Sequence, residues 1–123
     1  MKQLLSIIEI GGYPNFTALY QSLGYTVEVQ TTMRKVLKFL KKNQPNVIVA
    51  EFNFQSDFRD RTSSLESLMS MVQRLPDTKV IVFYDKEFSH QLTRLEARFE
   101  FVATLAFPIE ESHIKQVLQT LET

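Results

Sequence analysis

The sequence predicts an α/β domain built on one open, doubly wound parallel sheet, and three observations indicate it. Five short runs rich in β-branched residues alternate with five segments whose apolar residues recur at helical spacing. Two of the runs, VIVA and VIVF, are apolar on both faces, which is typical of central strands in a parallel sheet. The length of 123 residues suits a single domain spanning 1–123.

The expected strands are short and are separated by polar or turn-forming residues. They span 3–10, 25–30, 46–52, 78–84 and 101–106. The second, YTVEVQ, alternates apolar and polar residues, which indicates an edge strand. Right-handed crossovers favour the spatial order 2-1-3-4-5, in which ligands and chemistry gather at the carboxyl ends of the strands.

Each expected helix has a one-sided apolar stripe that would cover the sheet. Pro45 and Pro76 follow the second and third helices and mark their ends. The five stripes are Phe16, Leu19, Tyr20 and Leu23; Met33, Val36, Leu37 and Leu40; Leu65, Leu68, Met69 and Val72; Phe88, Leu92, Leu95 and Phe99; and Ile114, Val117, Leu118 and Leu121.

The composition argues against several classes of function. Lys plus Arg equals Asp plus Glu at 14 each, and zero net charge argues against non-specific nucleic-acid binding. The absence of cysteine removes disulfides, thiolate chemistry and cysteine-based zinc sites. The N-terminal segment MKQLLSIIEIGG lacks the clean apolar run of a signal peptide or a membrane span. We therefore expect a cytoplasmic protein with no membrane attachment.

One carboxylate, Glu51, interrupts the apolar run VIVAEFNF near the end of the third expected strand. Desolvating an unpaired carboxylate is expensive, so we expect Glu51 to be partly solvated at the strand end. Glu9 lies near the end of the first strand. Both carboxylates would then lie at the edge of the sheet where such folds place their sites.

Four segments together carry a family resemblance: LGYTVEVQTT, QPNVIVAEFNF, DTKVIVFYD and TLAFPIEESHIKQVL. They resemble landmarks of the receiver domains of bacterial response regulators, and the resemblance covers essentially the whole chain. It implies a flavodoxin-like fold, with a five-stranded parallel sheet of order 2-1-3-4-5 and five helices. It also implies a role in two-component, phosphorelay signal transduction.

The resemblance implies a phosphorylation site as well, and this chain departs from the family at each position of that site. Glu51 occupies the place of the phosphoacceptor aspartate, and only Glu9 represents the acidic pair that holds magnesium. Tyr84 replaces the threonine or serine that ends the fourth strand. Thr104 replaces the switch aromatic of the fifth strand.

Phe107 replaces the family's lysine in the step before Pro108. The resemblance implies a cis peptide bond at this step, with the Phe107 ring packed into the pocket that the cation has left. Phosphoryl transfer depends on positioning and electrostatics, and this sequence has lost the groups that supply both. We therefore expect a pseudo-receiver that is not an enzyme and has no catalytic residue, metal or cofactor.

A module of this kind would act through protein partners of a signalling pathway. The family commonly docks or forms homodimers through the fourth helix, fifth strand and fifth helix. Charged residues of both signs occupy that face here and suit crossed ion pairs. They are Arg94, Arg98, Glu110, Glu111 and Lys115.

Two alternative functions stay open. A phosphorylatable receiver could use Glu51 with Glu9, although the missing lysine and hydroxyl argue against it. A small-molecule-binding flavodoxin-like module could use the strand-end crevice, although no phosphate-binding loop is present. Glu51 itself is either a fixed charge that partly imitates phosphorylation or a tolerated remnant, and we prefer the remnant.

Two further features have both a functional and a structural interpretation. Phe54 and Phe58 either form a partner-binding lip or fold over the neighbouring helix, and we prefer the second. The second helix is strongly basic, which gives either a solvated face, the interpretation we prefer, or a surface for nucleic acid or an acidic partner. Its basic residues are Arg34, Lys35, Lys38, Lys41 and Lys42.

Overall fold

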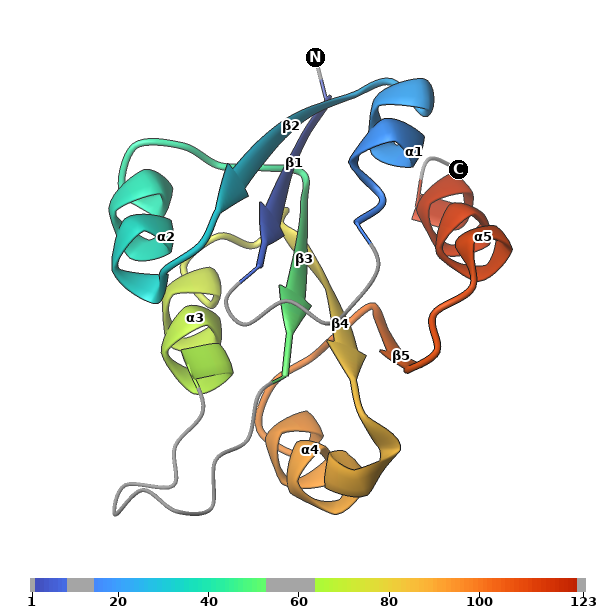
Figure 1. The fold of residues 1–123 in the computed structure, drawn as a ribbon. Coiled ribbons are helices and arrows are strands. Elements are labelled where there is room, and N and C mark those ends of the chain that lie inside the picture. Colours follow the sequence, from blue (N-terminus) through green and yellow to red (C-terminus); the bar gives the residue numbers. More distant parts are fainter. Residues whose placement is uncertain (1, 9–14, 53–63, 122–123) are drawn as a thin grey trace.

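Five parallel strands form one sheet in the structure, a computed structural model that describes residues 2–8, 15–52 and 64–121. Glu9, Phe54 and Phe58 lie outside these residues, so their predicted roles stay predictions. The spatial order β2-β1-β3-β4-β5 confirms the predicted order (Figure 1). The strands are β1 (Lys2–Ile7), β2 (Tyr25–Gln30), β3 (Val47–Glu51), β4 (Lys79–Tyr84) and β5 (Ala103–Ala106).

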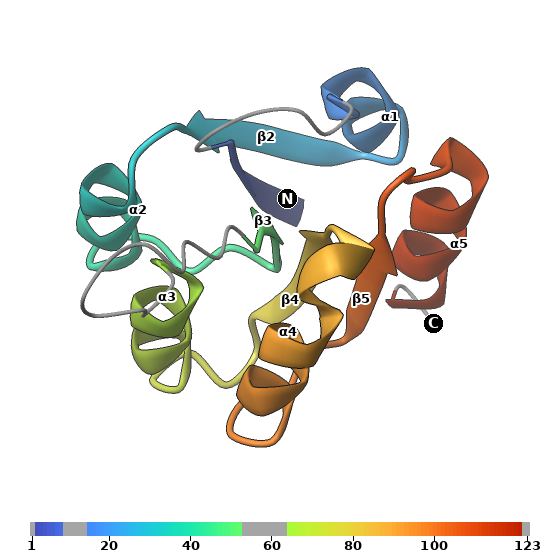
Figure 2. The same cartoon turned by 60° about the horizontal axis from the view of Figure 1, so that its bottom comes forward.

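Helices cover both faces of the sheet, as a doubly wound fold requires. Figure 2 shows α1 and α5 on one face and α2, α3 and α4 on the other. None of the helices in the described ranges is long and apolar enough to cross a membrane. The helices are α1 (Thr17–Ser22), α2 (Met33–Leu40), α3 (Ser64–Val72), α4 (Ser89–Glu96), which follows a short 3-10 turn at Lys86–Phe88, and α5 (Glu111–Leu121).

The apolar core consists of two clusters separated by the sheet. Alternate residues of a strand point to opposite faces, so each strand contributes to both clusters. The cluster under α2, α3 and α4 includes Leu5, Ile48, Val82, Leu68 and Leu92, and the cluster under α1 and α5 includes Leu4, Val49, Phe83, Ile114 and Leu118. All five residues of β3 are buried, as predicted for a central strand.

Local contacts fix two of the connections that lead into and out of the edge strand β2. Gly24 has a φ of 95°, a left-handed conformation that favours glycine, and it turns the chain from α1 into β2. The Thr32 hydroxyl accepts a hydrogen bond from the Lys35 backbone N–H at 3.3 Å and caps the start of α2. These contacts place α2 beside the end of β2.

Candidate functional site at the carboxyl ends of the strands

Glu51 is buried at the end of the central strand β3, with only 4% of its surface exposed. The prediction that it would be partly solvated is therefore wrong. In the sheet register Glu51 lies opposite Phe83, and the Phe52 N–H donates to the Phe83 carbonyl at 2.8 Å. β4 pairs with β3 as far as this strand end, and Phe16 and Tyr20 line the cavity beside Glu51.

Among the described residues, a small cavity of about 20 Å³ lies beside Glu51 at the strand ends. A cavity needs about 10–15 Å³ to hold one water molecule, so this space holds about one water and no phosphoryl group. The lining comes from β1, β3, β4 and the start of α1: Ser6, Ile7, Ile8, Asn15, Phe16, Tyr20, Val49, Glu51 and Phe83.

Three aromatic rings close the crevice next to Glu51. Phe16 packs edge-to-face on Tyr20 and on Phe83, with ring centroids 6.4 Å and 6.1 Å apart. Such pairs contribute about 0.5–1.5 kcal/mol beyond area burial. Burial raises the pKa of the Tyr20 hydroxyl, so the side chain stays neutral at physiological pH. These rings make the site apolar around one carboxylate.

The sequence contained a signal for this aromatic cluster that our reasoning did not use. Phe83 shares its strand face with Glu51 because the two residues are register partners. Phe16 and Tyr20 were assigned only to a general helical stripe, although their spacing places two rings on one helix face directly after β1. Aromatic residues at these three positions predict a filled crevice.

Tyr84 and Thr104 are not brought together with Glu51. Tyr84 is half-buried and packs against the cluster under α2, α3 and α4, on the face of the sheet opposite Phe83. Thr104 pairs with Val82 of that same face and is also half-buried. The structure therefore places no hydroxyl from either predicted position in the cavity beside Glu51.

The Phe107–Pro108 peptide bond is cis, which confirms the first part of the prediction for this turn. The second part is wrong, because Phe107 is 43% exposed and does not line the cavity. Its N–H donates to the Tyr84 carbonyl at 2.7 Å, which ties the turn to β4. The rings of Phe16, Tyr20 and Phe83 line the cavity where Phe107 was expected.

The described residues that line the cavity, which do not include Glu9, do not fit a magnesium ion. Magnesium takes near-octahedral oxygen ligands at about 2.0–2.1 Å and usually keeps several waters. The cavity lining offers one carboxylate, Glu51, among mainly apolar side chains. Within residues 2–8, 15–52 and 64–121, no three His, Cys, Asp or Glu residues gather as a metal site.

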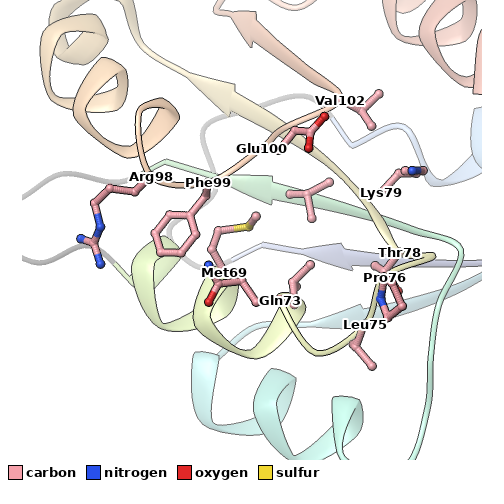
Figure 3. Close-up of a pocket in the computed structure, with 12 residues that line it drawn as sticks. Met69, Gln73, Leu75, Pro76, Thr78, Lys79, Arg98, Phe99, Glu100 and Val102 are labelled. Atoms are coloured by element: carbon pink, nitrogen blue, oxygen red, sulfur yellow. The ribbon is translucent and has the colours of Figure 1, made fainter.

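A larger hollow of about 320 Å³ lies at the other end of the strands, near the starts of β4 and β5 (Figure 3). It lies between the end of α3, the start of β4 and the connection from α4 to β5. Buried Met69, Val72 and Phe99 form its apolar part, and Lys79 and Glu100 are exposed at its rim. Its size falls at the lower end of ligand pockets, but it is far from the predicted strand-end site.

The predicted homodimer face gains no support from the contacts of the described residues. Arg98 forms an ion pair with Glu66 of α3 and lies 5.0 Å from the centre of the Phe99 ring. This arginine is therefore directed toward α3 rather than toward β5 and α5. Arg94, Glu110, Glu111 and Lys115 are exposed on the surface.

We expect Glu51→Gln to change the free energy of unfolding by less than about 1 kcal/mol. Glutamine keeps the length and one carbonyl oxygen of Glu51, and it removes a charge from a buried position. Urea denaturation of both proteins checks this, with the exposed Glu100→Gln as the matched control. A loss of several kcal/mol for Glu51→Gln alone would mean that the charge anchors a buried network.

No protein-family model matches the sequence, and no curated protein matches it either. Solved structures match it closely in fold. The Vibrio cholerae chemotaxis protein CheY4 has a TM-score of 0.75 at 18% identity, covering 98% of both chains. The response regulator TrrA of Thermotoga maritima, solved with Mg²⁺ and BeF, has a TM-score of 0.69 at 16% identity, covering 98% of this chain and 99% of that one.

A third match is a redox sensor of the streptococci, described as belonging to a family that evolved from two-component response regulators. It has a TM-score of 0.76 at 15% identity, over 98% of this chain and 51% of that chain. Similarity at these identities concerns the course of the backbone. Together with the sheet order and helix placement, it gives this chain the fold of response-regulator receiver domains.

Proposed function

We propose that the chain is a receiver-like signalling module that binds protein partners and has no phosphoryl-transfer activity. The observation that carries this proposal is the closed crevice at the strand ends. There Glu51 is 4% exposed and lines a cavity of about 20 Å³ together with the rings of Phe16, Tyr20 and Phe83. A phosphoryl donor cannot approach a carboxylate in that environment.

The groups that would assist phosphoryl transfer are also misplaced or missing. Phosphoryl transfer needs fixed positive charge and hydrogen-bond donors aimed at the transferred group. Phe107 contributes no cation, and Tyr84 packs on the opposite face of the sheet. A buried carboxylate also presents little charge to a partner, so Glu51 is better explained as a remnant than as an imitation of phosphoaspartate.

The fold supports a signalling role because two of the matching structures are a chemotaxis protein and a response regulator. The third match indicates that the fold is also used by redox sensors that evolved from two-component response regulators. A pseudo-receiver keeps the scaffold and its binding surfaces while the switch is absent. On this proposal the chain is not an enzyme, and it signals by binding or releasing a partner protein.

We expect acetyl phosphate with magnesium to add no phosphoryl group to this protein, because the crevice excludes both. Intact-mass spectrometry after incubation checks the result, with the response regulator TrrA of Thermotoga maritima, solved with Mg²⁺ and BeF, treated in parallel. A mass increase of one phosphoryl group that disappears in Glu51→Gln would overturn the proposal. It would favour the alternative in which Glu51 acts with Glu9.

A further inference from the structure

The surface of α2 and the turn after it carries a dense group of positive charges, named here the basic stripe. All of its side chains are exposed. No acidic residue occurs between Glu28 and Glu51, although the whole chain has zero net charge. The basic stripe consists of Arg34, Lys35, Lys38, Lys41 and Lys42.

Helical geometry places the basic stripe on one side of α2. At 100° per residue the five positions fall within an arc of about 120°, and at 1.5 Å per residue they extend over about 12 Å. The opposite side of the helix holds Val36 and Leu40, which are buried against the sheet. Figure 1 shows α2 at the periphery of the fold, beyond β2 and beside α3.

The positive charges of the basic stripe are not neutralised within the described residues, where none of the five forms an ion pair. Lys38 has a basic residue at each of its i−4, i−3, i+3 and i+4 positions. Like charges at these spacings destabilise a helix by about 0.2–0.5 kcal/mol a pair. A helix face that is only solvated would be more stable with charges of both signs. The solvated face that we preferred from the sequence therefore does not account for this arrangement.

The chemistry of the basic stripe favours carboxylates as its ligands. Four of its five residues are lysines, whose ammonium groups act as point charges and bind a carboxylate without requiring a planar, bidentate partner. Phe39, the aromatic residue of this helix, is half-buried against the core and is not placed to stack on bases. The apolar side of α2 faces the sheet and is therefore not available for insertion into a lipid surface.

Leu37 adds an apolar contact at one margin of the basic stripe. It is half-buried, and helical geometry places it next to Lys41. A charged face bordered by one apolar residue suits an amphipathic protein helix with glutamates at i, i+4 and i+7 and an apolar residue beside them. We propose that the basic stripe docks such an acidic helix of a partner protein. This inference rests on the proposed function only in that the partner is a protein.

A charge-reversal pair tests the proposal. The probe is a fluorescein-labelled synthetic helix with glutamates at i, i+4 and i+7 and one flanking leucine, measured by anisotropy at physiological salt. We expect Lys38→Glu with Lys41→Glu to weaken binding by about tenfold or more, because attraction becomes repulsion across the contact. Its thermal midpoint should not fall below that of the wild type, since Lys38→Glu removes like-charge neighbours.

The matched control is Arg74→Glu with Lys86→Glu, two exposed residues outside the basic stripe. Both double variants have the same net charge, so the control should bind the probe within about threefold of the wild type if the contact is local. A scrambled peptide of equal composition should bind more weakly. Equal weakening by both variants, or equal binding of both peptides, would overturn the proposal.

Two further titrations test whether the basic stripe binds nucleic acid or a membrane instead. A 20-base-pair DNA duplex and vesicles with 30% phosphatidylserine are titrated under the same conditions. Tighter binding of either than of the acidic helix, lost in Lys38→Glu with Lys41→Glu, would overturn the assignment to a protein. Failure of the acidic helix to bind would overturn it too, while the result with acetyl phosphate decides the proposed function separately.

Discussion

Replacing Phe83 with alanine is expected to lower the free energy of unfolding by about 3–5 kcal/mol, the usual range for a buried phenylalanine. Phe83 is 4% exposed, packs edge-to-face on Phe16, and lines the small cavity with Glu51. Removing the ring joins its volume to a cavity that already exists and leaves a carboxylate beside it. Urea denaturation monitored by circular dichroism measures the loss.

Phe107→Ala is the control for this experiment, because it deletes the same ring at a nearby strand end. Phe107 is 43% exposed, so its truncation should change the free energy of unfolding by less than about 1 kcal/mol. The comparison tests whether the ring of Phe83, rather than that of Phe107, fills the crevice. Similar losses for the two variants, or a larger loss for Phe107→Ala, would contradict the closure described here.

The sheet could be predicted because its pattern depends on local composition. The apolar runs VIVA and VIVF lie in β3 and β4, two of the three strands that are flanked on both sides. The alternation in YTVEVQ correctly indicated an edge strand. The last strand was predicted two residues too long at its start, since Phe101 and Val102 are apolar but precede β5. Phe101 packs against the core from the connection, which apolarity alone does not distinguish from a strand.

The state of the candidate site was harder to predict, because it depends on contacts between distant segments. Glu51 was expected to be partly solvated on the argument that an unpaired carboxylate avoids burial. The cavity beside it is lined by Phe16, Tyr20 and Phe83, which the sequence separates from it by about 30 residues on either side. The family resemblance gave the correct cis turn at Pro108 but the wrong ring in the crevice.

For the basic stripe, too, the charges could be predicted from the sequence, but their contacts with other elements could not. Its five charges could be counted in the sequence, and one helix face was correctly expected for them. Whether acidic side chains of other elements neutralise them was a question of tertiary structure. Among the described residues the ion pair that forms joins Arg98 to Glu66, away from α2. The lack of ion pairs for the basic stripe among the described residues is the tertiary observation on which the proposed docking rests.

Leu68→Ala is expected to lower the free energy of unfolding by about 2–5 kcal/mol, because the side chain is completely buried in the cluster under α2, α3 and α4. Helix α3 has nine residues, and an isolated helix shorter than about 12–15 residues is marginal in water. Packing of Leu65, Leu68 and Met69 therefore stabilises α3 more than its intrinsic propensity does.

Ser70→Ala serves as the control within the same helix. Ser70 is exposed, and its hydroxyl donates to the Glu66 carbonyl at 3.1 Å, a bond to the preceding turn that adds little stability. Alanine has the higher helix propensity, so Ser70→Ala should leave the free energy of unfolding within about 0.5 kcal/mol of the wild type. Guanidinium denaturation measures both variants. If Leu68→Ala were as mild as Ser70→Ala, α3 would be held by local propensity, and the cluster beneath it would not be the core of this face.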